Sequence, residues 1–389
     1  MAGLLTDLSV AGSLIARTLT GGHSNKIPSP EPSDGFETKL SASLAAIDQN
    51  LVAEYQWLTM KATQAPWVSS GITLNPGDHV SWFVCGRAYA SKLLDIWVDP
   101  RIQVWAKIGS QGTLISPTRL SHSHTAEQAG ELCFGNYFPN DWADPQGTLL
   151  QDKSVYKSMS GHSRILVIRW AVPAAEGLAA LKAAGDHQSY IANELERINQ
   201  GSTTPEGWSY LFNIGDAEIY KHAHNEHGAC MHCNTRADTG ILQKEVSLPL
   251  TQHTTLSWQW CVDTLPSTLR EDSLPSHDYM SIAVEFENGR DITYYWSHNL
   301  AEGTGYDCPL PNWAGKEYHV VVRSSTQGLG EWLNESRNVY EDYQHYMGEP
   351  PKRIVKIWLI ANSAFQRQPG DCTYANIELK NQDQSINVL

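Results

Sequence analysis

Short segments rich in β-branched and aromatic residues recur along most of this 389-residue chain. In the first half they are separated by turn sequences such as Asn-Pro-Gly-Asp, and they lie at 79–86, 102–109, 131–138 and 164–172. The second half contains further segments at 254–265, 279–287, 291–298, 317–325, 353–362 and 372–380. Runs of this length and composition are typical of strands. They predict a mainly β protein with two antiparallel β-sandwich, jelly-roll-like domains joined by helical segments.

Three other segments predict helices. From 36 to 63 apolar residues recur every three or four positions, and 173–204 is rich in Ala, Leu, Glu and Lys. A third helical pattern, at 328–348, ends at a glycine that two prolines closely follow. We therefore divide the chain into a flexible N-terminus and linker (1–35), a helix with a β-sandwich (36–172), a helical connector (173–204) and a second β-sandwich with an inserted helix (205–389).

The charge balance excludes some partners. The chain has 28 Lys+Arg and 42 Asp+Glu, a net charge of −14. Nucleic acids and anionic membranes require a basic surface, so neither is expected as the main partner. No apolar run approaches the roughly 20 residues that a membrane span needs, and we expect no secretory signal. The seven cysteines are odd in number and scattered, which predicts free thiols in a cytoplasmic, reducing compartment.

Common catalytic and cofactor motifs are absent from the sequence. It contains no Gly-x-Ser-x-Gly, Gly-x-Gly-x-x-Gly, Walker loop or His-Glu-x-x-His, and we expect no cofactor. The segment 221–238 combines four His with two Cys, which can hold zinc. However, it has a single Cys-x-x-Cys pair, and adjacent residues of a strand point to opposite faces. We interpret His222 and His224 as part of a strand and loop that lines or caps a cleft, with zinc as the alternative.

The fourteen tryptophans are the most unusual feature of the composition. Several lie with tyrosines in the strand segments of the second half, beside candidate polar groups. We interpret them as an aromatic-walled pocket in which a guanidinium binds an anionic oxygen and an acid or imidazole transfers a proton. Core packing with a structural Arg–Asp pair is the alternative. The candidate residues are Trp258, Trp260, His277, Asp278, Tyr294, Trp296, Arg323 and Trp332.

Three stretches of the first half resemble the galactose-binding lectin-like β-sandwich. Residues 65–87, 105–115 and 130–147 contain, in order, a Trp-Val pair, a Gly-Ile-x-Leu segment, a Gly-Asp turn, a Gly-x-Leu-Ile segment and a Gly-x-Leu strand that runs into Asn and Asp. The resemblance implies this fold and, with it, a calcium-supported sugar site. Calcium needs six or more oxygen ligands. The loop offers Asn140-Asp141 and Asp144, so we expect a structural sandwich with a degenerate loop.

The order of a helix, a lectin-like sandwich, a helical connector and a second sandwich resembles the fungal hetero-Diels–Alderases of tropolone–sesquiterpenoid pathways. The resemblance implies a cofactor-independent pericyclase. A hydroxymethyl tropolone-type precursor loses water to give an ortho-quinone methide, which adds stereoselectively to a humulene-type sesquiterpene. Such an enzyme holds two hydrophobic small molecules face to face in an apolar cavity and donates hydrogen bonds to the heterodiene oxygens.

The same resemblance implies roles for the candidate residues. Arg323 binds the tropolone oxygens, His277 or Asp278 transfers the proton, and the aromatic side chains shape the cavity. A carbohydrate-binding or polysaccharide-acting β-sandwich protein is the main alternative function, and a non-catalytic zinc or scaffold protein is a further one. Homo-oligomerisation is compatible with each of them.

Overall fold

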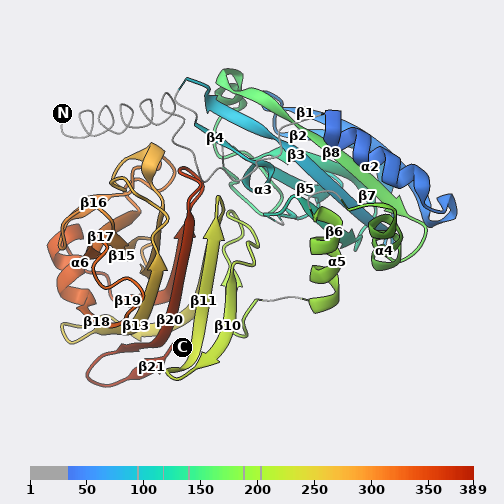
Figure 1. Cartoon of the computed structure of the whole chain (residues 1–389). Helices are drawn as coiled ribbons and strands as arrows, with labels where there is room; N and C mark the ends of the chain where they lie inside the picture. Colours follow the sequence, from blue (N-terminus) through green and yellow to red (C-terminus); the bar gives the residue numbers. More distant parts are fainter. Residues whose placement is uncertain (1–33, 94–95, 117, 139–140, 187–188, 202–203) are drawn as a thin grey trace. The chain divides into compact units, whose positions relative to one another are not determined.

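The computed structural model describes residues 34–93, 96–116, 118–138, 141–186, 189–201 and 204–389 (Figure 1). Nearly all of the N-terminal segment expected to be flexible, 1–35, lies outside the described residues. The chain divides into two compact units. Among the described residues, the lectin-like unit comprises those of 34–201 with 212–216, and the C-terminal unit comprises 204–211 with 217–389.

Two sheets form the lectin-like unit. The first has the order β1 (Val52–Lys61), β8 (Ser160–Trp170), β3 (His79–Ser91) and β4 (Ile96–Val98), with β6 (Ser121–Thr125) also paired to β3. The second has the order β2 (Trp67–Leu74), β7 (Gly130–Asn136) and β5 (Val104–Ile108). Apolar side chains from both sheets form one core, which includes Trp82, Val84, Phe134 and Val167. This arrangement is a β-sandwich, because two sheets bury their facing sides against each other.

Helices cover the other face of the first sheet (Figure 1). They are α2 (Asp34–Ala46), α4 (Ala174–Ala184) and α5 (Tyr190–Gln200). The unit also contains three short helical turns: α3 (Pro100–Gln103), η1 (Gln49–Leu51) and η2 (Lys153–Ser158). Leu40 of α2 and Leu178 of α4 pack with Phe83 and Leu166 of the sheet. The centres of β3 and β8, residues 82–85 and 165–168, are buried on both faces, and their sequences there are continuous apolar runs.

The helix expected over 36–63 is correct only for its first half. Helix α2 ends at Ala46, and residues 52–61 form β1, which pairs antiparallel with β8. The sequence of β1, VAEYQWLTMK, is rich in strand-forming residues. Leu51, Tyr55 and Leu58 happen to continue the apolar spacing of the preceding helix. Residues 52–61 nevertheless form a strand, because they pair with β8.

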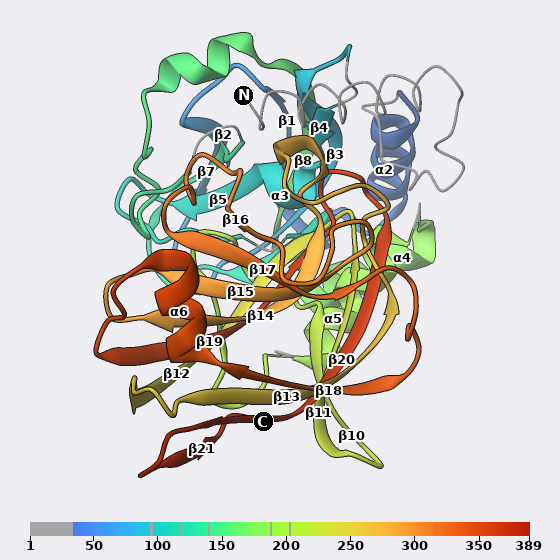
Figure 2. The same cartoon turned by 90° about the vertical axis from the view of Figure 1, so that its left-hand side faces the viewer.

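The C-terminal unit is also a sandwich of two sheets. Figure 1 shows β18 (Trp332–Asn338), β13 (Thr255–Thr264), β20 (Pro369–Lys380), β11 (Gly228–Arg236) and β10 (Tyr220–Asn225) side by side in that order, and β21 (Ser385–Asn387) pairs with β20. In the seven-stranded sheet, Figure 2 shows β16 (Gly305–Asp307), β17 (Glu317–Ser324), β15 (Asp291–Ser297), β14 (Tyr279–Phe286), β19 (Arg353–Asn362) and β12 (Thr239–Pro249) in that order. The last strand, β9 (Ser209–Tyr210), pairs with β12. Pairing is antiparallel except between β15 and β17, which run parallel. The mainly β class with two antiparallel sandwiches is therefore confirmed.

The helix expected over 328–348 begins later than predicted. Residues 332–338 form β18, which pairs with β13, and α6 (Val339–Met347) follows directly. Asn338 caps α6, since its side chain accepts a hydrogen bond from the Glu341 amide. The helical spacing of Trp332 with later aromatic residues was misleading, because an unpaired edge of β13 was available to the segment.

Two further observations bear on the sequence predictions. None of the seven cysteines, all of which are described, forms a disulfide bond. Among the described residues, no helix has both the length and the apolar character that crossing a membrane would require.

Candidate functional site

The register of the C-terminal sandwich brings Arg323 and four predicted aromatic residues together. Arg323 on β17 pairs with Trp296 on β15, and Trp258 on β13 pairs with Glu335 on β18. Paired residues of neighbouring strands lie on the same face, and Trp258, Tyr294 and Trp296 belong to the core between the sheets. We call the set Trp258, Trp260, Tyr294, Trp296, Arg323 and Glu335 the Arg323 cluster.

A carboxylate connects the guanidinium to the aromatic part of this cluster. Glu335 Oε1 accepts hydrogen bonds from Arg323 Nε at 2.6 Å and from Trp260 Nε1 at 3.2 Å. The Arg323 side chain is 33% exposed and that of Glu335 is 11% exposed. Among the described residues, the terminal nitrogens of Arg323 have no hydrogen-bond partner. Those N–H groups therefore remain available to a ligand.

The aromatic rings of the cluster are packed against one another. The ring centroid of Trp258 lies 5.7 Å from that of Trp260 and 5.9 Å from that of Tyr294, and Trp260 lies 5.8 Å from Trp296. All four side chains are buried. Burial, together with the nearby Asp342 carboxylate, raises the pKa of Tyr294 well above its usual value, and the phenol donates to Asp342 Oδ2 at 2.9 Å. These four rings pack in the core between the two sheets, whereas the sequence pattern predicted that they line a pocket.

The remaining predicted aromatic and imidazole groups lie elsewhere. Trp332 is half-buried at the start of β18, and its ring stacks on His227 with centroids 4.1 Å apart. His222 and His224 are exposed on β10, with ring centroids 5.3 Å apart. Cys233 belongs to the core, and strand alternation places Cys230 on the opposite face of β11. The structure therefore does not bring the residues of 222–233 together as one set of metal ligands.

His277 and Asp278 do not contact Arg323. Both are buried beside the outer face of the seven-stranded sheet. Asp278 Oδ1 accepts a hydrogen bond from the Phe365 amide at 3.0 Å, and Oδ2 accepts one from the Gln366 amide. His277 Nδ1 lies 2.6 Å from the Glu271 carbonyl oxygen, and burial lowers the pKa of His277 to about 3. The predicted Arg323–Asp278 pair is replaced by Arg323–Glu335.

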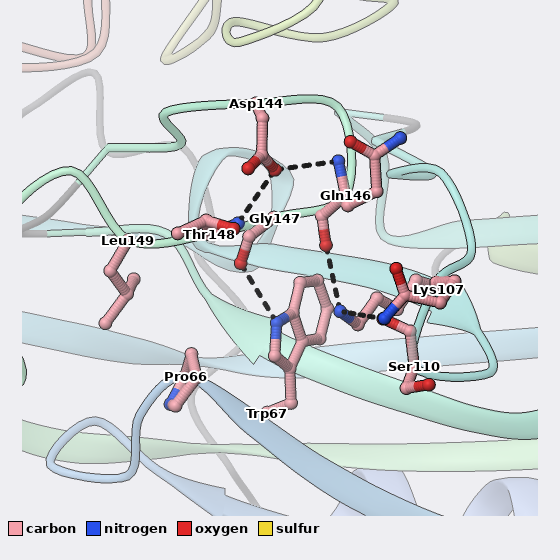
Figure 3. Close-up of a pocket in the computed structure, with 10 residues that line it drawn as sticks. Pro66, Trp67, Lys107, Ser110, Asp144, Gln146, Gly147, Thr148 and Leu149 are labelled. Atoms are coloured by element: carbon pink, nitrogen blue, oxygen red, sulfur yellow. Dashed lines mark hydrogen bonds between the residues drawn. The ribbon is translucent and has the colours of Figure 1, made fainter.

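A surface pocket of about 550 Å³ lies in the lectin-like unit (Figure 3). It is lined by Pro66, Trp67, Lys107, Ser110, Gln111, Asp144, Gln146, Gly147, Thr148 and Leu149, and we call it the Trp67 pocket. Trp67 begins β2, Lys107 lies on β5, and the other polar groups come from two loops. The volume falls within the range of small-molecule sites.

Hydrogen bonds hold the walls of the Trp67 pocket in place. Trp67 Nε1 donates to the Gly147 carbonyl at 3.2 Å, and Lys107 Nζ donates to the carbonyls of Gln146 at 2.8 Å and Ser110 at 3.2 Å (Figure 3). Lys107 Nζ also lies 4.4 Å from the centroid of the Trp67 ring. Burial lowers the pKa of the Lys107 ammonium. One N–H of this cation remains to be satisfied within the pocket.

In the loop where the lectin-like resemblance implies a calcium site, the described carboxylates accept hydrogen bonds from backbone amides. Asp144 Oδ1 accepts hydrogen bonds from the amides of Gln146 at 3.0 Å and Thr148 at 3.1 Å, which closes the loop against Trp67. Asp141 Oδ1 accepts one from the Trp142 amide. Asn140 lies outside the described residues. Asp141 and Asp144 therefore stabilise the loop conformation through hydrogen bonds to its own backbone.

Sequence reasoning missed two residues that matter to these sites. Glu335 occupies an ordinary position in a segment expected to be helical, so its proximity to Arg323 depends on β18 being a strand. Lys107 stands inside the quoted lectin-like segment 105–115, and a charged residue in an otherwise apolar strand was the available signal.

Part of the C-terminal half of the chain matches a family model. Residues 207–378, less than half of the chain, match a family described as "Protein of unknown function (DUF3047)". This match contains the entire Arg323 cluster. No curated protein sequence matches the chain.

Similar solved structures include lectin-like and carbohydrate-binding β-sandwich domains. The N-terminal domain of EclA, a PllA-like lectin, is 15% identical with a TM-score of 0.24, covering 31% of this chain and 99% of that one. The xyloglucanase domain of NopAA from Sinorhizobium fredii is 8% identical with a TM-score of 0.30, covering 47% and 96%. TmCBM61, solved with β-1,4-galactotriose, is 10% identical with a TM-score of 0.24, covering 48% and 94%. These identities and TM-scores are too low to indicate a function.

Proposed function

We propose that the protein is a cofactor-independent hetero-Diels–Alderase with Arg323 as the group that binds the tropolone oxygens. The proposal depends on the hydrogen bonding of the Arg323 guanidinium. Its Nε is fixed by Glu335, while its terminal N–H groups lack partners among the described residues. A planar guanidinium with two parallel donors matches a pair of adjacent oxygens, which is what a tropolone presents.

The chemistry required of this site is modest. The carbon–oxygen bond of the hydroxymethyl group breaks, and the hydroxyl leaves with a ring hydroxyl proton as water. The resulting ortho-quinone methide then forms one carbon–carbon and one carbon–oxygen bond to the alkene, giving a dihydropyran. Hydrogen bonds from Arg323 would lower the energy of charge that develops on the heterodiene oxygens. Holding both reactants together would remove most of the entropic cost of a bimolecular step.

The packed aromatic core supports this proposal indirectly. Trp260 donates to the same Glu335 oxygen as Arg323, and Trp260 and Trp296 are in contact. Both rings are rigidly packed, so the carboxylate and the guanidinium are held in one orientation. We assign no proton transfer to His277 or Asp278, because their polar atoms contact other groups.

Binding of the tropolone half can be tested without turnover. Calorimetric titration of the full chain with a hydroxymethyl tropolone should give saturable binding, and Arg323→Ala should weaken it at least tenfold. Arg353→Ala is the matched control, since Arg353 lies on β19 of the same unit and donates to Ser247 on the exposed surface. Equal affinity in all three proteins would remove Arg323 from the proposal.

A second function is favoured by the Trp67 pocket, which presents an ammonium, a carboxylate, amides and hydroxyls within one hollow. This mixture of donors and acceptors suits a hydroxyl-rich ligand, and we propose carbohydrate binding as the alternative. Trp142 stacks on the Trp67 indole at 5.1 Å and Lys107 lies over the ring, so recognition would depend mainly on hydrogen bonds. A glycan array followed by calorimetry tests it, and absence of any saturable glycan binding would reject it.

A further inference from the structure

A group of buried metal-binding side chains lies beside the outer face of the seven-stranded sheet. It consists of His277, Cys308, Glu317 and His319. His277 directly follows η3 (Leu274–Ser276), Cys308 directly follows β16, and Glu317 and His319 occupy alternate positions of β17. All four side chains are buried. The residues come from three separate parts of the unit, so folding is needed to bring them together.

The ligand atoms of these residues have the spacing of a tetrahedral site. One atom from each lies within 4.8 Å of the others. His277 Nε2 lies 3.5 Å from Cys308 Sγ, and His319 Nε2 lies 3.5 Å from Glu317 Oε1. Ligands bound to zinc at about 2.0–2.3 Å stand roughly 3.3–3.8 Å apart in a tetrahedron. The two measured separations already fall in that range.

Neighbouring hydrogen bonds orient the ligand atoms. His277 Nδ1 is within 2.6 Å of the Glu271 carbonyl, which can only accept, so Nδ1 carries the proton and Nε2 has a free lone pair. Glu317 Oε1 accepts hydrogen bonds from Tyr279 at 3.1 Å and Thr293 at 3.0 Å. A carbonyl behind a histidine and hydroxyls on a carboxylate are typical supports of metal ligands.

His319 provides an independent indication of a missing partner. Its side chain is fully buried, and Nε2 lies 3.5 Å from Glu317 Oε1, yet neither ring nitrogen makes a hydrogen bond to any described residue. The rings of His277, Tyr279 and Tyr306 surround it, with centroids 4.7, 4.9 and 5.1 Å away. Buried polar nitrogens are almost always satisfied, because leaving them unpaired is costly. A cation bound by Nε2 would satisfy one of these two nitrogens.

We propose that His277, Cys308, Glu317 and His319 form a structural zinc site. Four protein ligands complete a tetrahedron and leave no open position, which is the arrangement of structural rather than catalytic zinc. Thiolate, imidazole and carboxylate together suit this borderline metal. The ion would join the segment before β14 and the segment after β16 to β17. The site is separate from the Arg323 cluster and does not depend on the proposed function.

Metal content and cobalt spectroscopy of the full chain test the proposal. The purified protein should contain about one zinc per chain, and replacing it with Co²⁺ should give an absorption band of thiolate-to-cobalt charge transfer together with tetrahedral ligand-field bands. Cys308→Ser should abolish the charge-transfer band, and His319→Gln should lower Co²⁺ affinity at least tenfold. Cys261→Ser is the matched control, because this thiol of the same unit lies outside the cluster.

Each result decides the question. Zinc at one per chain, with a cobalt band that Cys261→Ser keeps and Cys308→Ser loses, supports the site. A folded wild-type chain that takes up neither metal, or a band that Cys308→Ser retains unchanged, overturns it. Should both ligand variants fail to fold, the presence or absence of the cobalt band in the wild-type protein alone decides.

Discussion

Arg323 Nε donates a 2.6 Å hydrogen bond to Glu335 Oε1, which joins the end of β17 to the edge strand β18. The two residues are twelve positions apart in sequence and belong to different sheets. Their contact therefore depends on the whole sandwich being assembled. It fixes Nε of the guanidinium, while the terminal nitrogens make no hydrogen bond within the part of the chain that the structure describes.

Glu335→Gln should reduce the proposed activity while changing stability little. The variant keeps a hydrogen-bond acceptor for Arg323 but removes its charge. Because the Arg323 side chain is one-third exposed, losing this ion pair should cost less than about 1 kcal/mol in unfolding free energy. Urea unfolding and the rate of dihydropyran formation measure the two effects. A variant with full activity would show that the carboxylate does not position Arg323.

Trp260→Ala should destabilise the C-terminal unit strongly. Its indole is fully buried and contacts Trp258, Trp296 and Tyr374. Truncation of such a side chain costs about 3–5 kcal/mol. Trp332→Ala, at a half-buried position, serves as the comparison and should cost clearly less. Equal losses in urea unfolding would contradict the packing described for the Arg323 cluster.

Gly147→Ala should close the Trp67 pocket. A Cβ at this position would overlap Cζ2 of Trp67, and the backbone has φ of +77°. Gly71→Ala is the matched control, since its φ is +78° and no atom lies within 4 Å of the added Cβ. Any glycan binding found for the wild type should be lost in Gly147→Ala and kept in Gly71→Ala. The reverse pattern, or loss in both, would place the ligand elsewhere.

Acid should destabilise the lectin-like unit through His122. Burial, with the nearby charge of Arg197, lowers the pKa of this imidazole well below its usual value. The unfolded chain takes up a proton below about pH 6.5 while the folded one does not, so stability is present above that pH and is lost as the pH falls. The free energy of unfolding should therefore decrease between pH 7 and pH 5. His122→Gln should reduce this dependence in urea unfolding, and an unchanged slope would contradict it.

Much of the fold could be predicted from residue patterns, and the errors have a physical cause. The centres of β3 and β8 are apolar and rich in β-branched and aromatic residues, so their strand conformation follows from local sequence. In contrast, 52–61 and 332–338 have mixed patterns that fit a helix or a strand, and an available partner strand decided each case. Local spacing carries no information about that partner.

The candidate sites show the same limit. Trp258, Trp260, Tyr294 and Trp296 lie together because alternate positions of neighbouring strands share a face, but they pack in the core, whereas the sequence pattern predicted that they line a pocket. The pairing of Arg323 with Glu335 depended on the register of β18, and the contact of Cys308 with His277 depended on how two loops cover the sheet. Neither is encoded in residue spacing along the chain.

The most direct test of the account is a rate measurement with both reactants. The full chain is incubated with a hydroxymethyl tropolone and humulene, and the dihydropyran products are separated by chiral chromatography. We expect one stereoisomer, formed faster than in buffer, and a fall of about 100-fold in the catalysed rate for Arg323→Ala with the Arg353→Ala control unaffected. A rate and an isomer ratio equal to those in buffer alone would contradict the proposed function.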